Sequence, residues 1–149
     1  MPHLAQLNIG KLLHPIDHPK ISEFVESIDR INRLAENSPG FVWRLKDESG
    51  NATDFHPFGN PLIIVNMSVW ESVEALKQYV YRSDHVNIMR KRHEWFEKHD
   101  KPFMVLWWIP EGHLPTVEEA KQRLALLQEK GETAEAFTFR RIFDPPILT

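Results

Sequence analysis

The hydrophobic pattern is most informative between residues 62 and 81. Leu62-Ile-Ile-Val-Asn-Met-Ser-Val-Trp70 is rich in β-branched residues and apolar on both of the faces that alternate along a strand. Such a segment belongs in the middle of a sheet that is covered on both sides. Glu71 to Tyr81 follows at once, with apolar residues at helical spacing. The pattern therefore predicts a strand that runs directly into a helix.

Other segments complete a mixed order of strands and helices. Residues 3–9, 41–46 and 103–109 have the pattern of strands, whereas residues 21–35, 84–98 and 116–131 have the pattern of helices. Thr116 and Glu119 form a capping-box signature at the start of the last helix. In the first strand, one face carries Gln6 and Asn8, which is notably polar for a central strand.

This order predicts an α+β, ferredoxin-like split βαβ fold with a four-stranded antiparallel sheet and its crossover helices on one face. We expect one domain over residues 1–149, with a core at 3–109, a C-terminal helix at 116–131 and an arm at 136–143. The opposite sheet face is predicted to be bare and apolar, so a second copy of the chain is expected to cover it. The sequence thus predicts a homodimer, and the arm is a candidate for docking on the partner subunit.

Composition narrows the class of protein. The chain has 149 residues, 42% hydrophobic and 26% charged, with a formal net charge of -3 and no cysteine. Disulfides, thiolate metal sites and cysteine nucleophiles are therefore excluded. We find no basic patch for nucleic acid and no apolar stretch long enough for a bilayer, so we expect neither partner and a cytoplasmic location.

His85 and two polar residues of the long strand are candidates for chemistry. His85 follows Asp84, a plausible N-cap, and could act as a general acid or base, or could simply bond neighbouring backbone. Asn66 and Ser68 interrupt an apolar run, where unsatisfied polar groups are costly. They could line a pocket or pair across a dimer interface.

Aromatic residues are candidates for the walls of a pocket for a flat hydrophobic molecule, although any one of them is more often part of the core. Adjacent Trp107 and Trp108 must point to opposite sheet faces. The remaining candidates for substrate binding are Trp43, Trp70, Tyr81 and Trp95.

The histidines do not form a recognisable metal motif. His14 and His18 are separated and followed by prolines, which bar the helix that their spacing needs. His93-Glu-Trp-Phe-Glu97 ends in Glu where the zinc-protease motif requires a second His. No metal site is expected.

Short motifs resemble a known superfamily. Pro39-Gly40-Phe41, and Trp70 to Leu76 leading to Ser83-Asp-His85, are similar to the dimeric α/β-barrel superfamily, which includes the antibiotic-biosynthesis monooxygenases. Nearly the whole chain more closely resembles domain-of-unknown-function family 3291, through His3 to Asn8, Phe41 to Arg44, Tyr81 to His85, Glu94 to Phe96, Leu106 to Trp108 and Phe137 to Arg140.

The resemblance implies a pocket between the sheet and its helices. Superfamily members carry out cofactor-free oxygenation, haem degradation or small isomerisations, or have no known chemistry. Asn8 and Tyr79 could match two positions of the haem-degrading branch, but Arg90 stands near its His position. Haem is therefore disfavoured, and we expect no cofactor.

Two functions remain open at this point. The first is a dimeric protein that acts on or holds a small hydrophobic molecule. If this protein is an enzyme, we expect a cofactor-independent monooxygenase. His85 would be the acid/base, Asn66 would polarise a carbonyl or peroxide oxygen, and Trp43 and Trp107 would shape the site. The alternative is a non-catalytic dimeric ligand carrier or interaction module with a packed interior.

Overall fold

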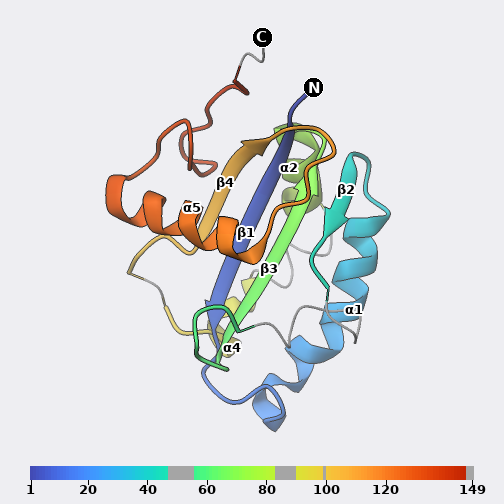
Figure 1. Ribbon diagram of the computed structural model, residues 1–149. Helices are drawn as coiled ribbons and strands as arrows, with labels where there is room; N and C mark the ends of the chain where they lie inside the picture. Colours follow the sequence, from blue (N-terminus) through green and yellow to red (C-terminus); the bar gives the residue numbers. More distant parts are fainter. Residues whose placement is uncertain (47–55, 83–89, 99, 147–149) are drawn as a thin grey trace.

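Four antiparallel strands form the central sheet in the order β2-β3-β1-β4 (Figure 1). The computed structural model describes residues 1–46, 56–82, 90–98 and 100–146. The strands are β1 (His3–Lys11), β2 (Phe41–Arg44), β3 (Ile63–Trp70) and β4 (Met104–Ile109). The predicted ferredoxin-like arrangement is confirmed, with the apolar segment Ile63–Trp70 as an inner strand.

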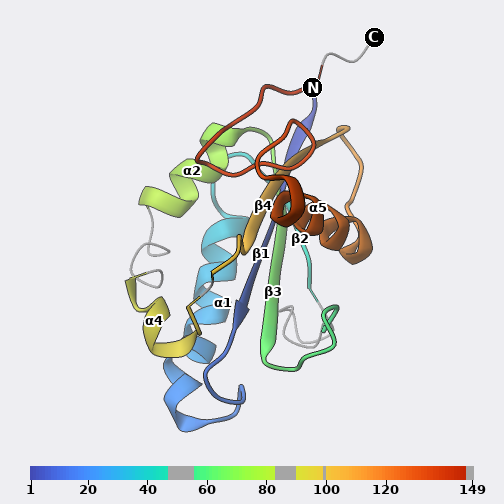
Figure 2. The same ribbon diagram turned by 90° about the vertical axis from the view of Figure 1, so that its left-hand side faces the viewer.

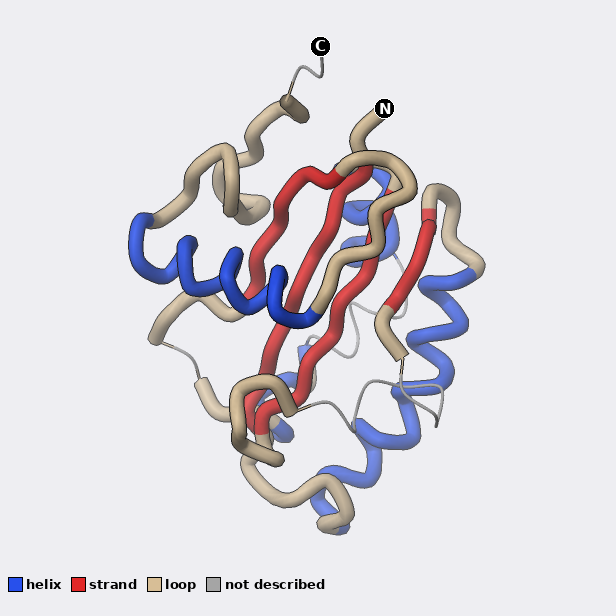
Figure 3. The backbone as a smooth tube through the Cα atoms, viewed as in Figure 1, coloured by secondary structure: helices blue, strands red, loops and turns tan. Residues whose placement is uncertain are grey.

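Helices lie on both sides of this sheet. A short helix, η1 (Pro19–Ile21), leads into α1 (Ser22–Glu36), and the later helices are α2 (Val73–Arg82), α4 (Arg92–Trp95) and α5 (Val117–Lys130). Seen on edge, the sheet has α1, α2 and α4 on one side and α5 on the other (Figure 2). In Figure 3 the strands form a layer behind α5. We call the two sides the α2 face and the α5 face.

The chain itself covers the α5 face. Ala120, Leu124 and Leu127 of α5 pack there and are at most 2% exposed. The inward residues of the three longer strands are also buried: Ala5, Leu7, Val65, Met67, Val69, Val105, Trp107 and Ile109. The expectation of a bare face is therefore wrong, because the C-terminal helix occupies it. The homodimer stays a prediction, but a second copy would need another surface.

The C-terminal arm also packs on its own chain. Phe137 is fully buried on the α2 face with Leu4, Trp70 and Leu106. Its backbone N–H donates to the Leu106 carbonyl at 2.9 Å and its carbonyl accepts from the Leu106 N–H at 2.7 Å. The arm therefore lies along the exposed side of β4 and needs no partner subunit to bury its central aromatic residue.

Two local predictions differ from the structure. Strict alternation along the strand predicted at residues 41–46 would place Phe41 and Trp43 on one sheet face. A register shift in β2 instead pairs Phe41 with Trp70 and Trp43 with Val69, so the two residues lie on opposite faces. The helix expected to continue to about residue 98 ends at Trp95 instead. Phe96 is extended there and forms a bridge with Leu12.

No helix in the described ranges has both the length and the apolar composition that a membrane span requires. Within those same ranges, no three His, Asp or Glu side chains are grouped so that they could hold a metal ion.

Both the backbone conformation at Gly40 and the close packing of Ala75 require a glycine at this position. Gly40 has φ +83° at the turn between α1 and β2, and an added Cβ would lie 2.5 Å from the Ala75 Cβ. Its carbonyl accepts the Glu71 N–H at 2.8 Å. This close approach fixes the start of α2 against the start of β2.

We expect Leu124→Ala to lower the free energy of unfolding by about 2–5 kcal/mol, because it leaves a cavity between α5 and the sheet. The matched control is Leu114→Ala, since Leu114 is 53% exposed. It should change the stability by less than about 0.5 kcal/mol. Urea unfolding of both variants measures the difference, and equal small losses would mean that α5 does not pack on the sheet.

Gly40→Ala should cost about 2–4 kcal/mol, because the left-handed backbone and the Ala75 contact both oppose a methyl group. Gly112 has φ +90° with nothing within 4 Å of an added Cβ, so Gly112→Ala isolates the backbone contribution. That control should cost about 1–2 kcal/mol. The same urea titration compares the two, and an equal cost would contradict the close α2 contact.

Candidate functional site

A cavity of about 460 Å³ opens on the α2 face of the sheet. This volume is within the range of pockets that bind small molecules, roughly 300–1,000 Å³. Three amide side chains lie on the sheet side of the cavity: Gln6, Asn8 and Asn66. The walls are largely apolar or aromatic and come from α2, the start of β4 and the arm: Leu76, Tyr79, Val80, Tyr81, Phe103, Met104 and Phe139.

The pairing of β1 with β3 brings the amides together. Asn8 lies opposite Asn66 and Gln6 lies opposite Ser68, so all four side chains share the α2 face of adjacent inner strands. Gln6 Nε2 donates to Asn66 Oδ1 at 2.7 Å and to Ser68 Oγ at 2.8 Å. Ser68 Oγ also accepts the indole N–H of Trp70 at 2.8 Å.

This network fixes the orientation of Asn66. Gln6 is 7% exposed and uses both of its amide hydrogens, one of them to hold the Asn66 Oδ1. Asn66 itself is exposed to the cavity. With its oxygen held by Gln6, Asn66 could offer its Nδ2 group as a hydrogen-bond donor to a molecule in the cavity. The site therefore offers a pre-oriented amide donor on a rigid strand.

Tyr79 closes the cavity from α2. Its ring stacks on Trp70 with centroids 5.1 Å apart, and its hydroxyl donates to the Ile31 carbonyl at 3.3 Å. Burial raises the pKa of Tyr79 well above its usual range, although the nearby Arg44 charge opposes the shift. The phenol therefore stays neutral and is not a base at physiological pH.

Arg90 is the one charged residue among the described residues that line the cavity. The polar groups of the described lining are the three amides, the hydroxyls of Tyr79 and Tyr81 and the Arg90 guanidinium, with no carboxylate or imidazole among them. The positions that the resemblance matched to the haem-degrading branch, Asn8, Tyr79 and Arg90, all meet at this cavity. The described lining contains no histidine that could serve as an axial ligand.

The structure separates the predicted site residues into distinct groups. Asn66 and Tyr81 line the cavity, while Ser68 and Trp70 are buried beside it in the hydrogen-bond network. Asn66 and Ser68 lie on the α2 face, not on the face that was assigned to a dimer interface. The pocket alternative is therefore the one that their placement supports.

Three predicted tryptophans lie elsewhere. Trp43 and Trp107 belong to the α5 face, so they cannot shape a site that contains Asn66. Trp95 packs with Leu12 and Ile21 in a separate cluster near the end of the sheet. His85 lies outside the described residues, and its assignment as acid/base remains a prediction.

The polar face of the first strand drew attention to Gln6 and Asn8, but the sequence did not predict that Gln6 lines the cavity, nor that Phe103 and Phe139 do. The signal for the two amides was present, because a polar face on an inner strand is unusual. Phe139 carried no such signal, since its position depends on the path of the arm.

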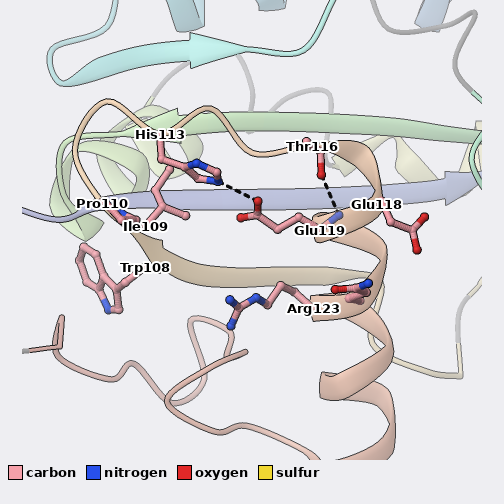
Figure 4. Close-up of a pocket in the computed structure, with 9 residues that line it drawn as sticks. Trp108, Ile109, Pro110, His113, Thr116, Glu118, Glu119 and Arg123 are labelled. Atoms are coloured by element: carbon pink, nitrogen blue, oxygen red, sulfur yellow. Dashed lines mark hydrogen bonds and ion pairs between the residues drawn. The ribbon is translucent and has the colours of Figure 1, made fainter.

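A second cavity, of about 530 Å³, lies between α5, the end of β4 and the loop that joins them (Figure 4). His113 Nε2 pairs with Glu119 Oε1 at 2.8 Å, and the Trp107 indole N–H donates to Glu119 Oε2 at 2.9 Å. Burial alone would raise the pKa of Glu119, but the hydrogen bonds from His113 and Trp107 outweigh it and lower the pKa.

Glu119 therefore ties the loop and β4 to α5. Its N–H donates to Thr116 Oγ1 at 3.0 Å, as the capping-box signature predicts, but its carboxylate bonds His113 and Trp107 instead of reaching back to the cap. Because both carboxylate oxygens are already engaged, we assign this cavity a structural role and take the α2-face cavity as the candidate site.

Comparison with solved structures supports the fold. A conserved protein from Methanosarcina mazei Go1 is 17% identical, with a TM-score of 0.52 over 73% of this chain and 92% of that chain. The NE2512 protein of unknown function from Nitrosomonas europaea is 14% identical, with a TM-score of 0.51 over 78% of this chain and 97% of that one.

The neighbours also include SnoaB, a cofactor-independent oxygenase from Streptomyces nogalater. It is 14% identical, with a TM-score of 0.50 over 78% of this chain and 100% of that chain. At these identities the likeness establishes the fold alone, in agreement with the four-stranded antiparallel sheet and helices that the sequence predicts.

No curated protein matches the chain in sequence. The family described as a domain of unknown function, DUF3291, matches residues 3–149, which is nearly the whole chain and includes every described residue of the candidate site. The chain therefore belongs to the DUF3291 family.

Proposed function

We propose that the chain binds a small, flat, hydrophobic molecule that carries a carbonyl or enolate oxygen, and oxygenates it without a cofactor. The observation that carries the proposal is the hydrogen bond from Gln6 to Asn66 Oδ1 at 2.7 Å, which leaves the amide nitrogen of Asn66 to act as a donor in a cavity whose walls are largely apolar. If the ligand oxygen accepts a hydrogen bond from Asn66 Nδ2, the rings of the ligand lie between the side chains of α2 and those of the arm.

The chemistry follows from where negative charge develops. Removing a proton beside a carbonyl gives an enolate, which can pass an electron to O₂ and then combine with it. A donor that is fixed in advance stabilises the enolate oxygen more than it stabilises the neutral ketone, so it lowers the barrier. Apolar walls strengthen that hydrogen bond by excluding water.

This proposal needs a base, and the described lining residues offer none. Tyr79 is neutral because burial raises its pKa, and Arg90 is a cation. We therefore propose His85 as the residue that takes the proton, on the strength of its sequence position alone. The similarity in fold to SnoaB, a cofactor-independent oxygenase, adds support for this reaction class.

Anthrone is a suitable probe, because it is flat and readily loses a proton beside its carbonyl. Its oxygenation is balanced without a cofactor: anthrone and O₂ give anthraquinone and water. Oxygen uptake measures the reaction, and quenching of tryptophan fluorescence measures binding.

Asn66→Leu should lower kcat for anthrone by roughly 100-fold, the usual cost of losing one oxyanion donor. Binding should weaken by only about tenfold or less, because a single neutral hydrogen bond contributes about 1 kcal/mol. Gln78→Leu, at an exposed amide of α2, is the matched control and should leave both quantities unchanged. Equal effects of the two variants would contradict the role of Asn66 as a hydrogen-bond donor to the enolate oxygen. Anthrone binding without any turnover by the unmodified chain would favour the non-catalytic carrier.

His85→Ala should abolish anthrone oxygenation and leave the thermal unfolding midpoint unchanged. His93→Ala is the control, because His93 is an exposed residue of α4. If His85→Ala retains the turnover of the unmodified chain, another group takes the proton. If it unfolds the chain, the residue is structural.

A further inference from the structure

Phe139 reaches the cavity from a part of the chain outside the four-stranded core. It lines the cavity together with Tyr81 of α2, and their ring centroids are 5.8 Å apart. The Lys77 ammonium lies 5.9 Å from the centre of the Phe139 ring. In Figure 2 the segment after α5 turns back toward α2. Because Phe139 of this segment lines the cavity, the arm makes one of its walls.

The arm is attached to the core on both sides of Phe139. Two residues before it, Phe137 exchanges both backbone hydrogen bonds with Leu106, at 2.7 and 2.9 Å, and its side chain is fully buried. Four residues after it, the Phe143 carbonyl accepts the Trp108 indole N–H at 2.8 Å. Phe139 is therefore the middle of a short span with two fixed ends.

The residues next to Phe139 are also fixed. The Thr138 hydroxyl donates to Glu132 Oε1 at 2.9 Å and accepts the Arg140 N–H at 3.1 Å. The Arg141 N–H donates to the Thr138 carbonyl at 3.2 Å, which closes a turn around Phe139. A side chain carried by such a turn has a set position, so its size decides how far a ligand can extend toward the arm.

We infer that Phe139 determines the length of the flat hydrophobic molecule that the cavity accepts. The inference rests on the proposed binding function and adds its selectivity: the core strands supply the amides that hold the ligand oxygen, and the arm supplies the wall at the far end of the rings. Shortening this side chain lengthens the cavity, and enlarging it shortens the cavity.

Two flat phenols of different length test this inference: 2-naphthol, with two rings, and 1-hydroxypyrene, with four. Their dissociation constants are measured by fluorescence titration for the unmodified chain, Phe139→Ala and Phe139→Trp. Phe139→Ala should shift the affinity ratio toward 1-hydroxypyrene by roughly tenfold, and Phe139→Trp should shift it toward 2-naphthol, as changes in pocket shape typically do. Ile142→Ala, an exposed arm residue outside the lining, should leave the ratio unchanged.

The outcomes separate this inference from the proposed function. If the unmodified chain binds the phenols but both Phe139 variants keep its ratio, Phe139 is not the selectivity wall and only this inference fails. If both variants lose affinity for the two probes equally, the ring is structural, and the inference fails again. If the unmodified chain binds neither phenol, the binding function fails and this inference fails with it.

Discussion

The need to bury both faces of one sheet constrains the rest of this structure. β3 and β4 carry apolar side chains on both of their faces, and burying a large one contributes about 1.5–3 kcal/mol. Helix α5 covers one face with Ala120, Leu124 and Leu127, and the Trp107–Glu119 hydrogen bond fixes it there. The other face is shared by α1, α2 and the arm. One chain thus provides both layers.

The polar residues of the α2 face lie in a sheet that is covered on both sides. An amide in the middle of a sheet is costly unless it is hydrogen-bonded, and Gln6 and Ser68 satisfy that requirement within the chain. Gln6 engages the oxygen of Asn66, and the Asn66 side chain is exposed to the cavity. A core built only for stability would place apolar side chains here, so these amides mark the candidate site.

The sequence predicts the strands well because their signals are local. The alternation in β1 and the two-faced apolar pattern of β3 need no knowledge of tertiary contacts, and the polar face of β1 already indicated Gln6 and Asn8. Periodicity cannot identify what packs on an apolar face, so α5 was not recognised as the cover and a second copy was expected instead. The register shift in β2 moved Trp43 away from the site for a similar reason, since a bulge depends on pairing across strands.

The position of Phe139 could not be predicted from its surroundings in sequence. Its place at the cavity follows from hydrogen bonds that Phe137 and Phe143 make with β4, more than 30 residues earlier in the chain. The strand pattern therefore indicates the amides on the sheet side of the site, whereas the wall formed by the arm is seen only in the tertiary structure. Aromatic residues of the α5 face were predicted for the site because composition alone cannot assign a tryptophan to one sheet face.

The most direct test of this account asks whether α5 covers the sheet of its own chain. Isotope-filtered NOE spectroscopy on an equal mixture of ¹³C-labelled and unlabelled chains reports only contacts between different chains. If α5 covers the sheet of its own chain, NOEs are expected from the Leu124 and Leu127 methyl groups to those of Leu7, Val65 and Val105 in a fully labelled sample, and none in the filtered spectrum of the mixture. Filtered NOEs among these methyl groups would contradict it, because the face would then be covered by another copy of the chain.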